Sequence, residues 1–196
     1  MKHNNHDYVD LGLPSGTLWA TCNVGANSPE EYGDYFAWGE TAPQDYYYLD
    51  TYKLTIDGGS TFTKYNGTDG KTTLAPEDDA AAVNWGGKWR MPTDAEWTEL
   101  RNKCTWKWKT MNGVKGYKVK SKTNGNSIFL PAAGYRFDDY LDHAGYDGYY
   151  WSSSLNTDSP YYAWYVDFLS GNVDRNYNYR YDGLSVRPVC KMVKDE

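Results

Sequence analysis

Apolar and polar side chains alternate along several segments of the C-terminal half, a pattern that predicts β-strands. Within residues 163–169, Trp164, Val166 and Phe168 share one parity, so they are expected to face a core. Asn124 and Gly125 join two such segments and predict a tight hairpin turn. The expected strands are residues 117–122, 127–130, 149–153, 163–169, 172–177 and 185–189.

Two helices are predicted upstream of these strands. The first is expected to begin at Pro76, because proline suits a first helical turn, and to end at Gly86. The second is expected to begin at Thr93, because Thr93 and Glu96 match a capping box. Its inner face is expected to hold three residues at helical spacing: Trp97, Leu100 and Cys104.

The N-terminal third predicts short strands near residues 9–11, 18–21 and 35–38, separated by glycine-rich turns. Residues 41–73 are polar and predict a long surface excursion, functional or merely inserted. Strands, then two helices, then more strands is an α+β order with short mixed or antiparallel sheets and long loops. Without a repeat or a clean linker, residues 1–196 are expected to form a single domain.

The composition of the chain limits the classes of partner that it is expected to bind. The chain has nine Trp and twenty Tyr, so aromatic rings must fill much of its core. A net charge of −6 argues against nucleic acid and anionic membranes as partners. A solvated strand face explains the basic cluster better than a nucleic-acid site does. That cluster is Lys103, Lys107, Lys109, Lys115, Lys118, Lys120 and Lys122.

Three cysteines, Cys22, Cys104 and Cys190, are too few and too far apart for a disulfide framework or a C-x2-C metal site. Buried free thiols are favoured, and one disulfide with one free thiol stays open. The sequence has no apolar run of transmembrane length, and the first residues lack the apolar core of a signal peptide.

The segment from Tyr149 to Val189 departs most from an ordinary composition. The parity of Tyr165 and Asp167 is expected to face solvent, and residues 172–178 repeat Asn or Asp at every second position. Asn and Asp are poor strand residues, so sheet stability does not explain them. With the nearby tyrosines they resemble the composition of an antibody paratope. The alternative is an ordinary surface where these residues serve local hydrogen bonds.

Four motifs add a resemblance. They occur in order at residues 85–97 (WGGKWRMPTDAEW), 130–134 (LPAAG), 150–154 (YWSSS) and 183–189 (GLSVRPV). Together they resemble the formylglycine-generating-enzyme-like branch of the C-type-lectin fold. The similarity extends from Tyr8 to about Val189. It is greatest to the variable proteins of diversity-generating retroelements and to a paralogous surface domain of gut bacteria.

This resemblance implies a C-type-lectin fold whose segment of about residues 150–189 is rewritten at adenine-containing codons. It implies display of ligand-binding side chains at Asn156, Asp158, Tyr161, Tyr162, Tyr165, Asp167, Asn172, Asp174, Asn176, Asn178, Tyr181 and Asp182. The fixed scaffold would be Trp151, Trp164, Phe168, Gly171, Gly183 and Arg187. The implied partner is a protein or glycan on another cell or particle, met at a cell surface or on a phage virion. The alternative is a non-variable adhesive or glycan-binding surface domain.

Catalysis is not expected. The namesake of the family oxidises a substrate cysteine and needs a reactive cysteine pair, which the three cysteines do not match. Asp138, Asp139, Asp142 and Asp147 predict an acidic solvated loop in preference to a calcium site. The calcium–sugar motifs of true C-type lectins, such as E-P-N with W-N-D, are missing. The sequence therefore predicts no cofactor and no metal.

Overall fold

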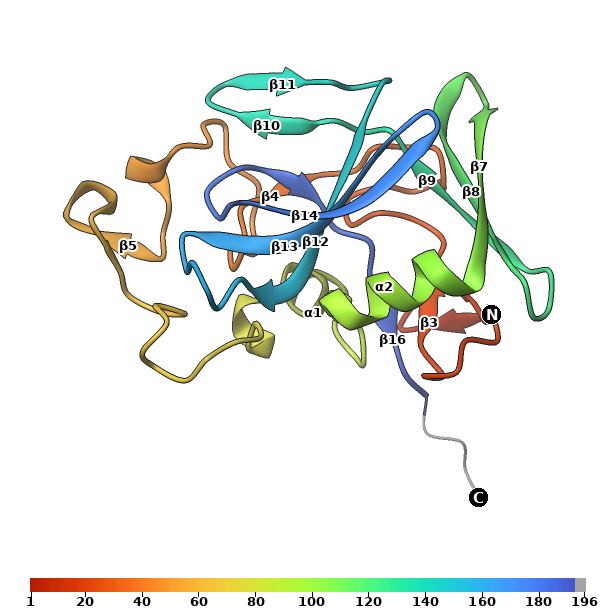
Figure 1. The fold of residues 1–196 in the computed structure, drawn as a ribbon, viewed down its shortest axis with the longest axis horizontal. Helices are drawn as coiled ribbons and strands as arrows, with labels where there is room; N and C mark the ends of the chain where they lie inside the picture. The colour runs from red at the N-terminus through yellow and green to blue at the C-terminus, as the bar shows by residue number, and fades with distance from the viewer. Residues whose placement is uncertain (193–196) are drawn as a thin grey trace.

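The computed structural model describes residues 1–192, which form five small sheets and two short α-helices (Figure 1). An N-terminal sheet has the order β1-β2-β3-β16, and a central sheet has the order β14-β13-β12-β15-β4. A third sheet has the order β7-β8-β9, and two hairpins, β5-β6 and β10-β11, complete the set. The prediction of a mixed, strand-rich α+β fold is confirmed at this level.

The bounds of the elements follow chain order. The strands are β1 Lys2–His3, β2 His6–Val9, β3 Leu18–Ala20, β4 Tyr35–Phe36, β5 Thr55–Ile56, β6 Thr61–Phe62, β7 Cys104–Met111, β8 Val114–Ser121, β9 Ser127–Pro131, β10 Tyr135–Phe137, β11 Tyr140–Asp142, β12 Gly148–Leu155, β13 Tyr162–Leu169, β14 Asn172–Tyr179, β15 Leu184–Ser185 and β16 Val189–Cys190. The helices are α1 Ala80–Trp85 and α2 Asp94–Lys103, with short 3-10 turns at Leu49–Thr51, Asp57–Gly59 and Pro76–Asp78.

The second helix confirms its capping signal. The Thr93 hydroxyl accepts from the Glu96 amide, and the Glu96 carboxylate accepts from the Thr93 amide. Cys104, however, is the first residue of β7 and not part of the helix. The first helix also begins later than predicted. Pro76 starts a 3-10 turn, and extended Asp79 caps α1 by accepting from the amides of Ala81 and Ala82.

Three strand predictions need correction. Residues 104–111 form β7. The alternation of Trp106 and Trp108 with lysines is typical of a strand, but placing Cys104 on the helix left this strand unpredicted. Residues 135–142 form the hairpin β10-β11, where only an acidic loop was expected. Residues 185–189 do not form one strand. Pro188 cannot donate to a ladder, so β15 pairs with β12 and β16 pairs with β3 in a different sheet.

Aromatic residues fill the core, as composition predicts. Trp19, Trp38, Trp89, Trp97 and Trp151 are all among the largest fully buried side chains. Buried Arg187 connects the sheets: its guanidinium donates to Asn23 Oδ1 and to the carbonyls of Ala20 and Phe129. Among residues 1–192, neither helix has the length and apolarity needed to cross a bilayer.

The excursion at residues 41–73 is folded against the central sheet at the left of Figure 1. Its anchor is Arg180, a fully buried side chain that directly follows β14. The Arg180 guanidinium donates to the Tyr52 hydroxyl and to the carbonyls of Lys64 and Tyr65. It also lies 4.3 Å from the centre of the Phe62 ring. Arg180 therefore ties the excursion to the strand-rich C-terminal segment, in addition to backbone hydrogen bonds of Tyr47 with Asp138 and of Thr72 with Leu155.

The sheet β7-β8-β9 contains an unfavourable pair, Lys107 opposite Lys118. Like charges directly opposite each other destabilise a sheet. Replacing Lys107 with glutamate creates an attractive pair in the same place. We expect K107E to raise the free energy of unfolding by about 0.5 kcal/mol. Urea unfolding checks this, and the gain should shrink in 1 M NaCl, where exposed charges are screened. A salt-independent change would contradict the electrostatic explanation.

Candidate functional site

The hairpin β13-β14 lies at the edge of the central sheet and has two different faces. Its register pairs Trp164 with Tyr177 and Tyr162 with Tyr179 on one face, and Tyr165 with Asn176 on the other. Cross-strand partners point to the same side of a sheet. The first face, here called the aromatic face, therefore carries rings from both strands. The second, here called the amide face, carries the Asn and Asp repeat.

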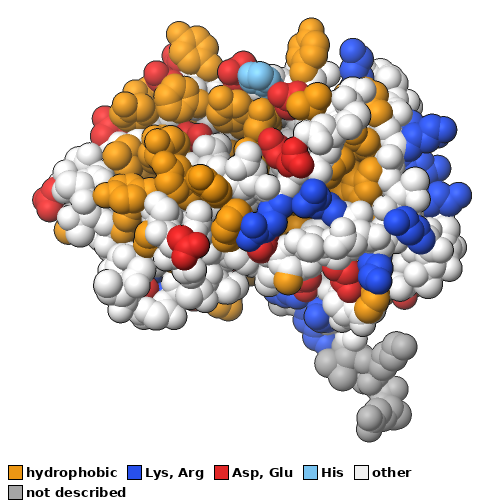
Figure 2. Space-filling view, viewed as in Figure 1, with side chains coloured by type: hydrophobic (Ala, Val, Ile, Leu, Met, Phe, Trp, Pro, Cys, Tyr) orange, Lys and Arg blue, Asp and Glu red, His pale blue; other side chains and the backbone are white. Residues whose placement is uncertain are grey.

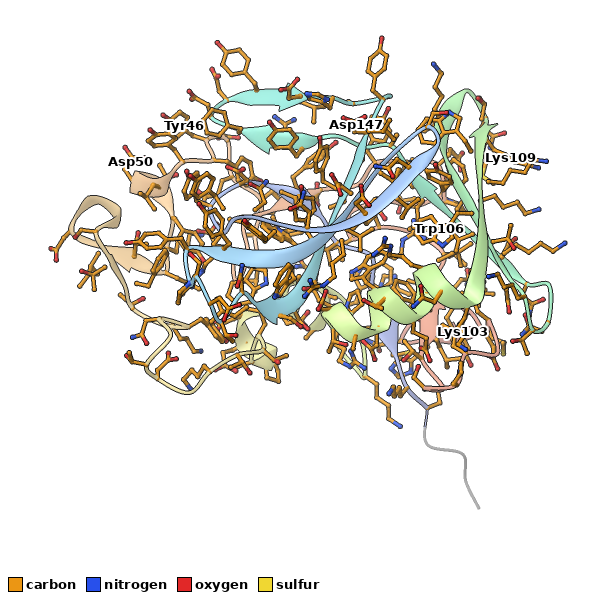
Figure 3. The ribbon with its side chains drawn as sticks, viewed as in Figure 1. Tyr46, Asp50, Lys103, Trp106, Lys109 and Asp147 are labelled. Carbon is orange, nitrogen blue, oxygen red and sulfur yellow. The ribbon has the colours of Figure 1, made fainter. Side chains whose placement is uncertain are left out.

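The aromatic face continues into a row of rings that crosses three segments of the chain. Tyr46 and Tyr48 come from the excursion, Tyr181 follows β14, and the other rings come from the hairpin. This aromatic row is Tyr46, Tyr48, Tyr181, Tyr179, Tyr162, Tyr177 and Trp164. Figure 2 shows hydrophobic side chains gathered over β13, β14 and the neighbouring elements. Figure 3 shows Tyr46 at the outer rim of this region.

Each ring of the row contacts the next. Tyr179 and Tyr181 are stacked at 5.1 Å, Tyr162 lies 4.8 Å from Tyr179, and Tyr48 lies 5.9 Å from Tyr181, all measured between ring centres. Tyr177 is nevertheless 48% exposed and Tyr179 41% exposed. Ring contacts restrict the side chains before any ligand arrives, which lowers the entropy lost on binding. The row is an ordered, exposed aromatic surface.

An arginine fixes one end of the row. The Arg175 guanidinium lies 3.4 Å from the centre of the Trp164 ring and forms a two-bond ion pair with Asp94, the first residue of α2. Stacking on a ring and bidentate pairing both suit the planar guanidinium. Arg175 therefore joins the hairpin to the helix, and its charge is balanced by the Asp94 carboxylate. Burial raises the pKa of Tyr181 to about 12, so its hydroxyl stays neutral.

The amide face is only partly the surface that the sequence predicts. Asn172, Asp174 and Asn176 are exposed, and Asn178 is half-buried. The prediction for Tyr165 is wrong: it is 6% exposed and belongs to the same core cluster as Trp151. The Tyr165 ring packs against the rings of Tyr149 and Trp151 in β12, which covers it. Asp167, on the same face of β13, is half-buried.

Two further predicted display residues are buried. Asn156 is 5% exposed and stabilises a turn, since its side-chain oxygen accepts from the Asp158 amide and its backbone carbonyl accepts from the Ser159 amide. Asp182 is 4% exposed, and its Oδ1 has no hydrogen-bond partner. Of the other predicted positions, Asp158 and Tyr161 are exposed, and Tyr162 and Tyr181 are half-buried.

Burial raises the pKa of Asp182 to about 7, and the Asn178 amide partly opposes that shift. An unfolded aspartate ionises near pH 3.9. The contribution of Asp182 to the free energy of unfolding is therefore fully present at low pH and is lost as the pH rises from about 4 to about 7. An asparagine side chain at this position cannot ionise. We therefore expect D182N to exceed the wild type by about 2–4 kcal/mol in unfolding free energy at pH 8.

The same comparison at pH 4 should give nearly equal stabilities, because the carboxyl is largely protonated in the folded state and about half protonated in the unfolded state. Urea unfolding at pH 4 and pH 8 tests this. If D182N and the wild type differ in unfolding free energy by the same amount at both pH values, the pKa of Asp182 is the same in the folded and unfolded states, which would contradict this prediction.

Four of the six predicted scaffold residues are buried. Trp151 and Arg187 are fully buried, Phe168 is 2% exposed, and Gly183 is buried. The Trp151 indole donates to the Phe36 carbonyl, which ties β12 to β4. Trp164 is half-buried and belongs to the aromatic row, and Gly171 lies in the exposed turn of the hairpin with φ +88°.

Cys104 and Cys190 are buried free thiols, as the sequence favours, and burial raises the pKa of each to about 11. Cys22 is a half-buried free thiol. In the part of the chain that the structure describes, no three His, Cys, Asp or Glu side chains form a group suited to a metal ion. The arrangement around the hairpin is suited to noncovalent contact.

Several residues of this surface were not predicted from the sequence. Tyr46 and Tyr48 belong to the run Tyr46-Tyr47-Tyr48, in which only Tyr47 is buried. Tyr177 was not among the predicted display positions, and Tyr179 was expected only as one of the tyrosines near them. Alternation of Tyr with Arg and Asn within β14 could have identified them, since neither parity of that strand is apolar.

A family model described as a domain of unknown function, DUF8237, matches residues 106–189. The match covers the chain from β7 to the start of β16 and includes the whole hairpin β13-β14. The description of this family states no activity. No curated protein matches the chain, and no solved structure matches it.

Proposed function

We propose that the protein is a non-enzymatic ligand-binding module that uses the aromatic row, with the exposed amide face beside it, as its contact surface. The observation that carries the proposal is the continuous row of mutually contacting rings from Tyr46 to Trp164, of which four are exposed and three half-buried. Tyrosine and tryptophan dominate binding energy in protein interfaces and stack on sugars and peptides. Large exposed aromatic surfaces on single domains mark interaction sites.

We further propose that the scaffold is the C-type-lectin fold of the formylglycine-generating-enzyme-like branch. The four motifs that carry the resemblance support this, because their large side chains are buried in the two main core clusters. Trp89, Trp97, Leu130, Trp151 and Val186 are each at most 1% exposed. The ligand is a protein or glycan on another cell or particle, and the protein acts at a cell surface or on a virion.

The contact surface is proposed to be hypervariable, the product of a diversity-generating retroelement. Support comes from the separation of roles along the hairpin. The side chains of Asn172, Asp174, Asn176, Tyr177 and Tyr179 are exposed, so their exchange removes little packing. Arg180, directly after them, is fully buried and holds the excursion.

Sequencing the gene in many isolates tests this proposal. Codon changes are expected to cluster at the exposed hairpin positions and at Tyr181, while Arg180 stays fixed between two changing neighbours. Asn156, Tyr165 and Asp182 are expected to change rarely, because each is buried. Changes spread evenly along the gene would contradict hypervariability and favour an invariant adhesive or glycan-binding domain.

A further inference from the structure

A second surface lies on the outer face of the sheet β7-β8-β9, at the right edge of Figure 2, where basic side chains gather. Lys107 and Lys109 of β7 share this face with Lys118 and Lys120 of β8. Figure 3 shows Lys109 pointing away from the molecule, whereas Trp106 lies on the inner side of β7. Within residues 1–192 these four lysines form no ion pair. Four unpaired cations thus lie together on a chain with net charge −6.

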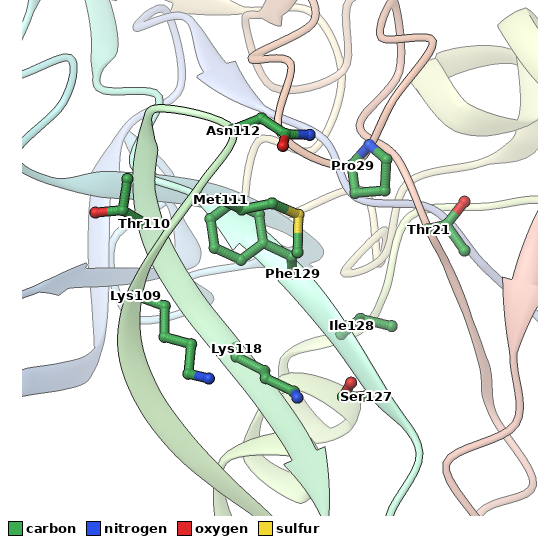
Figure 4. Close-up of a pocket in the computed structure, with 10 residues that line it drawn as sticks. All are labelled: Thr21, Pro29, Lys109, Thr110, Met111, Asn112, Lys118, Ser127, Ile128 and Phe129. Atoms are coloured by element: carbon green, nitrogen blue, oxygen red, sulfur yellow. The ribbon is translucent and has the colours of Figure 1, made fainter.

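A cavity adjoins this face. It has a volume of about 510 Å³ and lies between the sheet β7-β8-β9 and the loop at residues 21–29. Met111, Phe129 and Pro29 supply its apolar surface, and Lys109 and Lys118 extend side by side along it (Figure 4). The Asn112 amide donates to Glu30 at 3.1 Å, which joins the β7-β8 turn to the loop that carries Pro29.

A second, smaller hollow continues from the cavity. Its volume is about 200 Å³, and Thr105, Lys107, Lys109, Lys118 and Lys120 line it. Lys109 and Lys118 line both spaces. An apolar cavity and a basic hollow therefore adjoin each other and share two lysine side chains in their walls.

We propose that these two contiguous spaces bind one small amphipathic anion, an acyl or aryl group that bears a carboxylate or phosphate. The apolar group would occupy the cavity beside Met111 and Phe129, and the acid would lie among the lysines. Cavities of about 300–1,000 Å³ with few polar groups are typical of small-molecule sites. The acid would relieve the repulsion between Lys107 and Lys118, so binding supplies the counter-charge that the sheet lacks.

The same observations favour a single small ligand over an extended anionic partner. The apolar part of the site is a cavity and not a flat surface, and the four lysines beside it place their positive charge at its edge. The remaining net charge of the chain repels a bilayer or an anionic polymer that would approach over a wide area.

Methionine methyl NMR provides a direct test, because the chain has Met1, Met91, Met111 and Met192. Of these only Met111 lines the cavity, and Met91 is buried elsewhere in the core. Titration with dodecanoate and with dodecyl phosphate, both as monomers, is expected to shift the Met111 methyl signal alone. Dodecyltrimethylammonium should bind at least ten times more weakly. Equal binding of this cation, or shifts at Met91, Met1 or Met192 without Met111, would overturn the proposal.

Two variants separate the contributions. Lys109→Gln with Lys118→Gln should weaken dodecanoate binding at least tenfold, while the charge-matched pair Lys53→Gln with Lys71→Gln, exposed outside the site, should leave it unchanged. Ser127→Trp should fill the cavity and abolish the Met111 shift with an unchanged melting temperature. Equal losses in the two lysine pairs would overturn the proposal, as would binding only to anionic vesicles and not to monomers.

Discussion

Replacing Arg180 with methionine is expected to lower the free energy of unfolding by about 3–5 kcal/mol, the largest effect of any single change considered for this chain. Methionine keeps the apolar contact but removes every hydrogen bond of the guanidinium. The carbonyls of Lys64, Tyr65 and Pro160 would lose this donor inside the protein. An unsatisfied buried carbonyl costs about 1–3 kcal/mol. The contact of the cation with the Phe62 ring is lost as well.

Arg175→Met is the matched control for this experiment. Arg175 lies in the same segment but is exposed, and its ion pair with Asp94 is worth about 1 kcal/mol or less. Urea unfolding should therefore separate the two variants clearly. In thermal unfolding, Arg180→Met is expected to melt about 10 °C below the wild type. Equal small losses in both variants would contradict the anchoring role of Arg180.

Replacing Tyr177 and Tyr179 together with alanine is expected to weaken ligand binding at least about 100-fold while leaving the melting temperature within about 3 °C. The binding loss follows from hot-spot aromatics, whose truncation typically costs about 2 kcal/mol or more each. The melting temperature should change little because both rings lie on the edge strand, where they are 48% and 41% exposed and outside the buried core. The probe is the strongest binder from an oligosaccharide array and a phage-displayed peptide library. Isothermal titration then gives its affinity for each variant.

Two controls make this result specific. Tyr146 is 70% exposed and lies outside the aromatic row, so Tyr146→Ala should bind the probe like the wild type. Tyr165 is buried, and Tyr165→Ala should lower the unfolding free energy by about 3 kcal/mol. Unchanged affinity in the Tyr177 and Tyr179 variant, or a large fall in its melting temperature, would make the row a structural feature.

Local rules predict much of this fold from the sequence. The capping box at Thr93 and Glu96 fixes the start of α2 because both hydrogen bonds form within four residues. The parity of Val166 and Phe168 correctly identifies a core face, since alternation reports burial directly when one side of a strand is covered. The turn at Asn124-Gly125 is confirmed for the same local reason.

The display surface is harder to predict because exposure depends on what packs over each face of the sheet. Tyr165, on the face that alternation assigns to solvent, packs against the rings of Tyr149 and Trp151 and is buried. Tyr177 lies on the edge strand β14 and remains 48% exposed. Tyr46 and Tyr48 join the surface only through long-range folding of the excursion. Tertiary packing decides these outcomes, and parity alone does not specify it.

The proposed function requires a fixed frame that carries exchangeable side chains. A yeast-displayed library that randomises Asn172, Asp174, Asn176, Tyr177 and Tyr179 tests this most directly, with hen lysozyme as a defined target. Most members are expected to melt within about 5 °C of the wild type, and some are expected to bind lysozyme. A library in which most members fail to fold, or in which folded members never acquire binding, would contradict the account.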